Sequence, residues 1–178
     1  MITVLILSLL FIGGGAVYYN LKQYERRHYN TISEKAQSVL VELEQKLAGE
    51  KELPAQMEEY LTYLLVKFSN VFYSDMNLYD KNGNLIATSR QEVFKKGLLS
   101  TLMNVEAFRE LSVNGKLEYI HNEKIGTLNY LSAYVPFYNN DNKLLAYLNL
   151  PYFTKQTELK KEISTFIIAI VNIYIILY

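Results

Sequence analysis

The sequence lacks several residues on which common kinds of chemistry depend. Among its 178 residues there is no cysteine and no tryptophan, and there are two histidines. The absence of cysteine excludes a disulfide framework and thiolate chemistry, and two histidines without cysteine argue against a zinc site. The sequence also contains no glycine-rich phosphate loop and no G-x-S-x-G nucleophile elbow. We therefore expect no catalytic residue, no metal and no cofactor in this chain.

Net charge is also lacking, because 18 basic residues balance 18 acidic ones. A chain with no net charge and no basic block is not expected to bind nucleic acid. The charges are unevenly placed, however, since the first charged side chain is Lys22 and the last is Glu162. Two uncharged ends around a charged middle predict two membrane segments, 1–19 and 163–178, around a water-soluble domain.

The first uncharged end is long enough to cross a bilayer. A helix of residues 1–19 would measure about 28 Å, close to the thickness of the hydrocarbon core. Tyr18 and Tyr19 lie where an interfacial aromatic belt is found. A cleaved signal peptide is the alternative, but no basic residue precedes the apolar run, and GGGA is a poor cleavage site. A retained membrane anchor is therefore predicted.

The second uncharged end is shorter. A helix of residues 163–178 would measure about 24 Å, less than the hydrocarbon layer of about 30 Å. We expect the natural chain to continue beyond Tyr178, although a tail anchor is the alternative, because a mild mismatch costs little. The basic residues Lys22, Arg26 and Arg27 follow the first segment and favour a cytoplasmic middle domain. Long domains cross membranes largely regardless of charge, so we place the middle outside the cytoplasm.

Two amphipathic helices are predicted next. After the first segment, apolar residues recur every three or four positions, which is the helical period. They are Leu21, Tyr24, His28, Ile32, Ala36, Val39, Leu43 and Leu47. We interpret this stretch as a stalk helix over 20–50, continuous with the membrane segment, and His28 as a packed side chain rather than a ligand. A second helix follows Pro54, with Met57, Tyr60, Leu61, Leu64, Leu65 and Phe68 on its buried face.

After Asn70 the pattern changes to short strands. FYSDMNLYDKNGNLIATS predicts a hairpin whose tight turn uses Asn82-Gly83. A short helix is predicted between a cap at Asn104 and a stop at Asn114-Gly115. Three strand candidates follow, KLEYIHNE, GTLNYLSAYVPFY and KLLAYLNLPYF, with Pro151 expected to break the last. Connections this short join antiparallel strands, so the middle domain is predicted to be α+β.

The order of these elements resembles a known family. A membrane helix, a stalk, the LYDKNGNLIATS hairpin, a connecting helix and a meander resemble the extracytoplasmic Cache domain of bacterial sensors, a PAS-like fold. The segment from Tyr134 to Tyr178 is similar to the membrane-proximal part of sensor histidine kinases of the Bacteroidetes type. The resemblance implies a PAS/Cache-like antiparallel sheet with a long N-terminal stalk helix and flanking helices, between two transmembrane helices. The domains are then 1–19 membrane helix, 20–50 stalk, 51–153 sensor, 154–162 juxtamembrane helix and 163–178 second membrane helix.

The resemblance also implies a function and partners. The chain would be the signal-sensing part of a homodimeric two-component sensor histidine kinase in the bacterial inner membrane. ATP, magnesium and a response regulator would be needed only by a cytoplasmic kinase beyond Tyr178. His28 and His121 both fall in the sensor part, so neither is expected to be the phosphoacceptor. Two alternatives stay open: the sensor region of a chemoreceptor or cyclase, and a membrane-tethered scaffold or adhesion module without a ligand.

A ligand pocket is predicted from the alternation of side chains along the last three strands. Leu131, Ala133, Val135 and Phe137 share one parity and are expected to face a core. The opposite parity carries polar side chains, namely Tyr119, His121, Tyr130, Ser132, Tyr134, Tyr147 and Asn149. If the register brings them together, they line a pocket for a small polar ligand, and Arg109 could bind a carboxylate of that ligand. The alternative is that the tyrosines only cap the core. If the pocket does bind a ligand, we expect that ligand to act by moving the second membrane helix.

Overall fold

The computed structural model describes residues 2–47, 49–153, 164–165, 168–169 and 171. The chain divides into two compact units, Asn30–Phe153 and Met1–Tyr29 together with Thr154–Tyr178. The first unit holds a five-stranded antiparallel sheet and the helices that pack on it. The predicted α+β class is therefore confirmed, as are the antiparallel sheet, the long N-terminal helix and the flanking helices.

The predicted membrane segments stay predictions. The first, 1–19, falls within helix α1, which spans Ile2–Leu47. The predicted juxtamembrane helix, 154–162, lies outside the described residues, and of the second segment, 163–178, only 164–165, 168–169 and 171 are described, all of them helical. Within the part of the chain that the structure describes, no helix has the length and apolarity that a membrane crossing requires.

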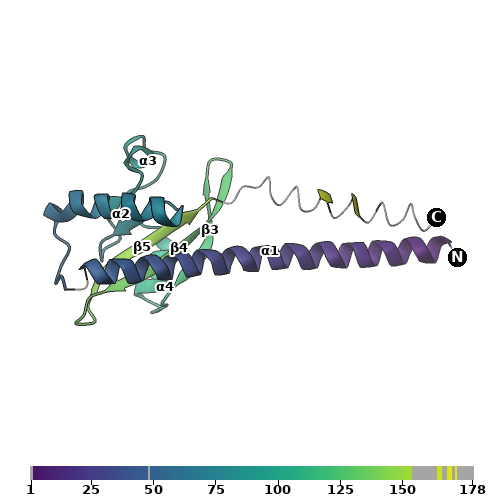
Figure 1. Ribbon diagram of the computed structural model, residues 1–178, viewed down its shortest axis with the longest axis horizontal. Helices are drawn as coiled ribbons and strands as arrows, with labels where there is room; N and C mark the ends of the chain where they lie inside the picture. Colours follow the sequence, from purple (N-terminus) through teal and green to yellow (C-terminus); the bar gives the residue numbers. More distant parts are fainter. Residues whose placement is uncertain (1, 48, 154–163, 166–167, 170, 172–178) are drawn as a thin grey trace. The chain divides into compact units, whose positions relative to one another are not determined.

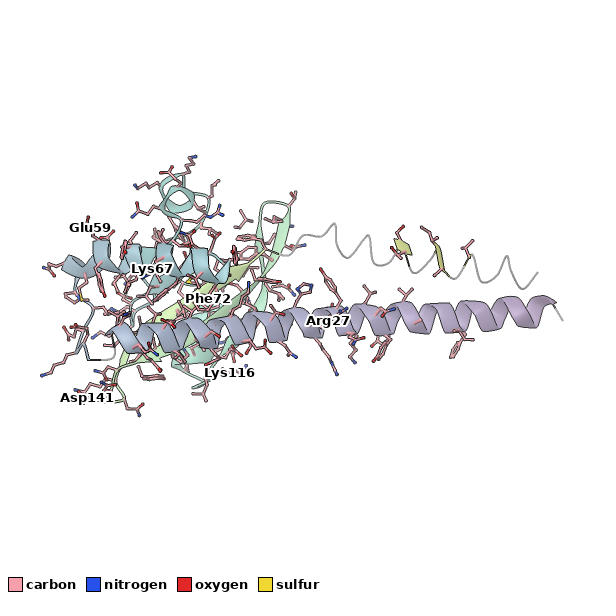
Figure 2. The ribbon with its side chains drawn as sticks, viewed as in Figure 1. Arg27, Glu59, Lys67, Phe72, Lys116 and Asp141 are labelled. Atoms are coloured by element: carbon pink, nitrogen blue, oxygen red, sulfur yellow. The ribbon has the colours of Figure 1, made fainter. Side chains whose placement is uncertain are left out.

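The two long helices cover one face of the sheet. The 3₁₀ turn η1 (Ala55–Met57) follows Pro54, and α2 (Glu58–Phe72) then runs back alongside the second half of α1 (Figure 1). Tyr60, predicted for the buried face of α2, is 44% exposed, so that part of the prediction is wrong. The apolar stripe of each helix is otherwise confirmed by residues that are at most 5% exposed. These are Ile32, Ala36, Val39, Leu43 and Leu47 of α1, and Leu61, Leu64, Leu65 and Phe68 of α2. Charged side chains such as Glu59 and Lys67 lie on the exposed side of α2 (Figure 2).

The strands are arranged in the order β2-β1-β5-β4-β3. Their bounds are β1 Asn77–Tyr79, β2 Leu85–Thr88, β3 Tyr119–Ile125, β4 Leu128–Tyr138 and β5 Leu144–Tyr152. The predicted hairpin is the β1–β2 pair, in which Gly83 has a φ of +83°. Asp80 Oδ1 accepts hydrogen bonds from the backbone N–H groups of Asn82 and Asn84, which closes the turn.

Two short helices join β2 to β3. The first, α3 (Gln91–Lys95), is not predicted from the sequence. The second, α4 (Val105–Ser112), is the predicted short helix, and the side chain of Asn104 accepts hydrogen bonds from the backbone N–H groups of Glu106 and Ala107 as its N-cap. The prediction of an Asn104 cap is therefore confirmed.

Two prolines lie inside strands where a neighbouring strand has ended. Pro151 in β5 pairs with Ser132 of β4, but β1 begins opposite Asn149, so no residue of β1 pairs with Pro151. Pro136 in β4 likewise lies beyond the last pair between β4 and β3. The prediction that Pro151 breaks the last strand is wrong, because a missing N–H disrupts a sheet only where a partner strand needs it.

The two faces of the sheet have different neighbours. The predicted core residues Ala133, Val135 and Phe137 are fully buried, Leu131 is 9% exposed, and all four belong to the main apolar cluster with α1 and α2. On the opposite face, α4 forms a smaller cluster with Tyr79, Tyr134 and Tyr147 through residues such as Ala107 and Leu111. Since α4 is only eight residues long, it covers part of this face and leaves room beside it.

Candidate functional site

A single row of polar residues crosses all five strands on the face that carries α4. Thr88, Asn77, Asn149, Tyr134 and Tyr119 occupy successive strands and are paired in register with one another. Because side chains alternate along a strand, these five project to the same side of the sheet. The register therefore brings together polar residues that are up to 72 positions apart in the sequence.

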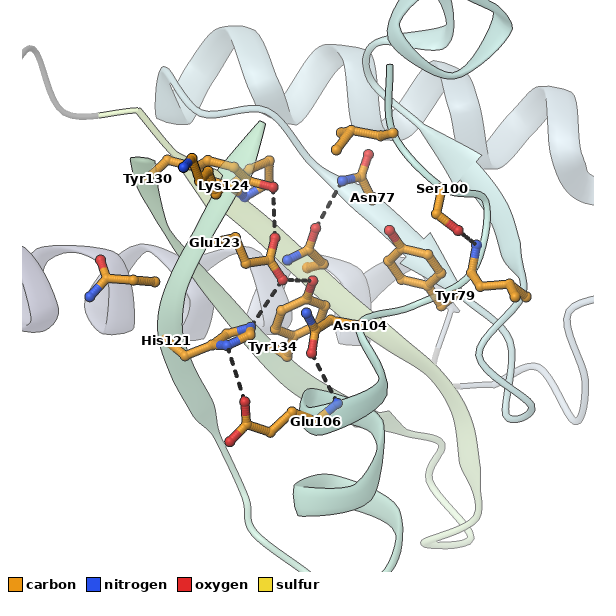
Figure 3. A pocket seen from close by; sticks show the side chains of 15 residues that line it. Asn77, Tyr79, Ser100, Asn104, Glu106, His121, Glu123, Lys124, Tyr130 and Tyr134 are labelled. Atoms are coloured by element: carbon orange, nitrogen blue, oxygen red, sulfur yellow. Dashed lines mark hydrogen bonds and ion pairs between the residues drawn. The ribbon is translucent and has the colours of Figure 1, made fainter. Parts of the chain in front are cut away.

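A pocket of about 380 Å³ lies on this face (Figure 3). Its walls come from strands β1, β5, β4 and β3, from the segment 99–104 and from the first turn of α4. The side chains that dominate it are polar, namely Asn77, Tyr79, Glu123, Tyr130, Tyr134 and Asn149. All of it lies within the unit Asn30–Phe153.

Glu123 is the centre of the hydrogen-bonding network in the pocket. Its Oε1 accepts hydrogen bonds from Tyr134 Oη at 2.6 Å and from His121 Nε2 at 3.0 Å, and its Oε2 accepts one from Tyr130 Oη at 2.7 Å (Figure 3). The Glu123 side chain is 13% exposed. Burial opposes its ionisation, but the three hydrogen bonds and the charge of His121 outweigh burial and hold the pKa of Glu123 below its usual value. The carboxyl group is therefore ionised at neutral pH.

The tyrosines beside Glu123 stay neutral. Burial raises the pKa of Tyr130, and the hydrogen bond and negative charge of Glu123 raise it further. Burial likewise raises the pKa of Tyr134, and the same carboxylate adds to the effect. A neutral phenol next to a carboxylate is the hydrogen-bond donor, so the hydroxyl hydrogens of both tyrosines are directed at Glu123.

His121 lies between two carboxylates. Its Nε2 is 3.0 Å from Glu123 Oε1, and its Nδ1 is 4.0 Å from Glu106 Oε2. The imidazole ring also contacts the rings of Tyr119 and Tyr134, with centroid separations of 4.9 and 5.8 Å. These contacts hold the ring at the wall of the pocket, where a protonated His121 would have a carboxylate on each side.

A chain of amides and hydroxyls forms the floor of the pocket. Thr88 Oγ1 donates to Asn77 Oδ1 at 2.7 Å, and Asn77 Nδ2 donates to Asn149 Oδ1 at 2.8 Å. Asn149 Nδ2 donates to Ser132 Oγ at 2.7 Å and to the carbonyl oxygen of Ala133 at 3.1 Å. A backbone carbonyl can only accept, so the bond to Ala133 determines the orientation of the Asn149 amide. The orientation of Asn77 then follows.

Tyr79 differs from the other tyrosines of the pocket. It is 4% exposed, yet no described residue forms a hydrogen bond with its hydroxyl, which is turned toward the pocket (Figure 3). Burial raises the pKa of Tyr79, and the charge of Glu123 raises it further, so the phenol is neutral. Its hydroxyl is therefore a free hydrogen-bonding group facing the pocket.

The structure brings together some of the predicted site residues but not all. His121, Tyr130, Tyr134 and Asn149 line the pocket. Ser132 lies behind Asn149 as its hydrogen-bond acceptor, while Tyr119 and Tyr147 pack beside Tyr134 and under α4.

Arg109 is not part of the pocket. Its side chain is 64% exposed, and its guanidinium lies 3.6 Å from Glu110 of the same helix. The suggested contact between Arg109 and a ligand carboxylate therefore has no support from its position.

Sequence reasoning missed Glu123, Tyr79 and Asn77. For Glu123 a signal existed, because it lies two positions beyond His121 on the same strand and so on the same face. For Tyr79 and Asn77 no local signal existed, since their place depends on the pairing of β1 with β5.

The groups at this site are suited to ion pairs and hydrogen bonds. In the described ranges, no group of three or more histidine, cysteine, aspartate or glutamate side chains could hold a metal ion. The site instead offers an ionised carboxylate, neutral hydroxyls and amides, a combination that holds a small polar molecule by charge and hydrogen bonds.

No protein-family model and no characterised protein matches the chain by sequence. The solved structures that are similar to it include three sensor domains, each at low identity. The first is the sensor domain of DcuS from E. coli, at 10% identity and a TM-score of 0.45, over 77% of this chain and 97% of that one. The second is the sensor domain of the V. cholerae histidine kinase DctB, at 14% identity and a TM-score of 0.44, over 71% of this chain and 55% of that one.

The third is the sensory domain of the Campylobacter jejuni chemoreceptor Tlp3, solved with isoleucine bound. It is similar at 12% identity and a TM-score of 0.42, over 89% of this chain and 60% of that one. This chain thus spans little more than half the length of the second and third structures. All three are sensor domains, and the isoleucine belongs to the chemoreceptor.

Proposed function

We propose that the unit Asn30–Phe153 is a ligand-sensing domain and that its ligand binds in the pocket around Glu123. The observation that supports this most is the pocket itself, an acidic, hydrogen-bonded cavity of about 380 Å³ on the face of the sheet that α1 and α2 leave uncovered. A carboxylate that is 13% exposed costs free energy to bury, and buried titratable groups of this kind cluster at functional sites.

A ligand in this pocket would contact the strand that leads out of the domain. Asn149 and Pro151 of β5 line the pocket, and β5 ends at Tyr152. On the other side, Ser33 of α1 donates a hydrogen bond to Glu118 Oε2 at 2.9 Å, one residue before β3. The pocket therefore has a short route to α1 and to the end of β5. A ligand shifts these elements only by binding one arrangement more tightly than another.

We further propose that the domain lies outside the cytoplasm between two membrane segments, 1–19 and 163–178, and that it controls a histidine kinase. The support is the resemblance of the hairpin, the meander and the membrane-proximal segment to such sensors. In this proposal the protein acts as a homodimer in the inner membrane. Its kinase, with ATP and magnesium, phosphorylates a response regulator.

Ligand binding can be tested on the full chain in detergent micelles. We expect at least one compound of a small-metabolite panel to raise the melting temperature, because a ligand at about 100 times its Kd stabilises a protein by about 2.7 kcal/mol. The variant Tyr79→Phe removes only a hydroxyl without a described partner, so it should fold normally and bind more weakly. Tyr138→Phe, at the 38% exposed end of β4, is the matched control. A panel in which no compound shifts the melting temperature would count against a sensing role.

The location can be tested with a single introduced cysteine, because the chain has none of its own. Val113 is 74% exposed at the end of α4, and Val113→Cys gives a unique label site. A maleimide that cannot cross the inner membrane should label Val113→Cys in intact cells. Labelling only after the inner membrane is permeabilised would place the domain in the cytoplasm and exclude the proposed topology.

A further inference from the structure

The pocket around Glu123 contains an uneven mixture of hydrogen-bond donors and acceptors. Tyr130 and Tyr134 both use their hydroxyl hydrogens on Glu123. What these phenols still present to the pocket is oxygen lone pairs. The hydroxyls of Tyr130 and Tyr134 are therefore hydrogen-bond acceptors toward any ligand, although they donate to Glu123.

The Asn149 amide shows the same bias, whereas Asn77 keeps one N–H and Asn104 keeps its Nδ2 group without a described acceptor. Both N–H groups of the Asn149 amide are used, one on Ser132 and one on Ala133. Its Oδ1 accepts one hydrogen bond from Asn77 and has a lone pair left. Glu123 has one unused acceptor position as well, because its two oxygens can accept about four hydrogen bonds and receive three.

The charge of the pocket points the same way. Glu106 and Glu123 line it, and Lys124 is the one lysine or arginine among the described lining residues. Lys124 is exposed, and the alternation along β3 starts its side chain on the face opposite to Glu123. The only described basic side chain within ion-pair distance of Glu123 is the imidazole of His121, whose Nε2 lies 3.0 Å from Glu123 Oε1.

We infer that the ligand of this pocket carries a protonated amine, which binds at Glu123 among the oxygens of Tyr130, Tyr134 and Asn149. This inference rests on the proposed sensing function and specifies its ligand. An ammonium group has three N–H donors and a positive charge, so it matches a site that offers acceptors and a carboxylate. A carboxylate ligand would instead bring acceptors to acceptors and a negative charge to Glu123.

Tyr79 gives the ligand a second point of attachment. Tyr79 as a residue is 4% exposed, and its hydroxyl faces the pocket and has no described partner. It is thus the natural donor to an oxygen elsewhere on the ligand. Diamines, amino alcohols and amino acids all carry an ammonium group. Diamines have no oxygen, amino alcohols have a hydroxyl and amino acids have a carboxylate, so the three classes can be distinguished experimentally.

The first test compares matched probes on the unaltered full chain in detergent micelles. Ethanolamine is compared with ethylene glycol, putrescine with 1,4-butanediol, and glycine with glycolate, and succinate serves as a dianion. The first and third pairs differ in one amine replaced by a hydroxyl, and the second pair differs in two. We expect calorimetry to detect binding of at least one amine. Its hydroxyl counterpart should bind at least about 100-fold more weakly, because the loss of one partner of a buried charge pair has a cost of that size.

The second test removes the carboxylate. Glu123→Gln should weaken binding of the amine about 100-fold while keeping a side chain of the same shape. Glu106→Gln should have a smaller effect, because Glu106 is 58% exposed. Glu92→Gln on α3, which is 75% exposed and outside the pocket, should leave binding unchanged. Thermal melting of each variant without ligand shows whether it is folded.

The outcomes separate the ligand class from the sensing function. Succinate or a neutral compound could bind instead of an amine. If Tyr79→Phe weakens that binding, and Glu123→Gln strengthens it or leaves it unchanged, the inference of an amine is wrong while the pocket remains a ligand site. If every amine fails to bind, the inference is wrong as well. If no compound in the panel binds at all, both the amine and the sensing function fall.

Discussion

Removing the hydroxyl of Tyr134 tests the hydrogen-bond network directly. Tyr134 is 3% exposed, and its ring packs against the α4 cluster, which the variant Tyr134→Phe keeps. The hydroxyl donates to the ionised Glu123 at 2.6 Å, and hydrogen bonds to charged groups contribute about 1.5–3 kcal/mol. We therefore expect Tyr134→Phe to lower the free energy of unfolding by about 1.5–3 kcal/mol at pH 7.

The effect should depend on pH, and the sign follows from the carboxylate. The pKa of Glu123 is lowered in the folded state, so its contribution to stability is present above the pKa of the unfolded chain and is lost as pH falls through the folded pKa. Tyr134→Phe removes one interaction that lowers this pKa and leaves burial in place, so the loss begins at a higher pH in the variant. Once Glu123 is protonated in both proteins, the difference should shrink to about 1 kcal/mol, the contribution of a neutral hydrogen bond.

The assay is chemical denaturation of the full chain in detergent micelles from pH 7 down to pH 3. Tyr63→Phe is the control, because Tyr63 is 62% exposed on α2 and its hydroxyl faces solvent. This control should change stability by no more than about 0.5 kcal/mol. A cost for Tyr134→Phe that is the same at pH 7 and at low pH would refute the reasoning, since it would mean that the Tyr134 hydroxyl does not bind an ionised carboxylate.

Three further predictions concern the fold that positions the pocket. Phe137→Ala should lower the unfolding free energy by about 3–5 kcal/mol, because Phe137 is fully buried in the main cluster; chemical denaturation measures it, and a cost under 1 kcal/mol contradicts the assigned core. Asn104→Ala should cost about 1 kcal/mol and speed hydrogen exchange in the first turn of α4, whereas unchanged exchange would mean that the cap does not form. Gly83→Ala should destabilise by more than about 1 kcal/mol, because φ is +83° and the new Cβ would lie 3.3 Å from Phe108 and 3.4 Å from Met103; a neutral or stabilising result in a thermal melt contradicts the turn geometry.

The helices and the class of the fold could be predicted from periodicity. Residues such as Val39 and Leu65 recur at helical spacing and are fully buried. The missed helix α3 is only five residues long, and its N-cap residue Arg90 makes no capping hydrogen bond through its side chain. A helix that short has neither a full apolar stripe nor a cap to reveal it.

The face of the site could be predicted, but its composition could not. Alternation along β3, β4 and β5 placed Tyr134 and Asn149 on one parity, and the pairing between these strands follows from short turns. The contribution of β1 depends on its pairing with β5, which is a contact between distant parts of the chain. Without the register between β1 and β5, the sequence gives no reason to distinguish Asn77 and Tyr79 from other hairpin residues.

The pairing of β5 has a mechanical consequence. β5 is hydrogen-bonded to β1 on one side and to β4 on the other, and its side chains alternate between the pocket, with Asn149, and the helix-covered core, with Leu148 and Leu150. An extended strand is already close to its maximum length of about 3.3 Å per residue, so it cannot stretch to absorb a displacement. We therefore expect a shift of Asn149 along the strand axis to be passed on to Phe153, where the domain ends.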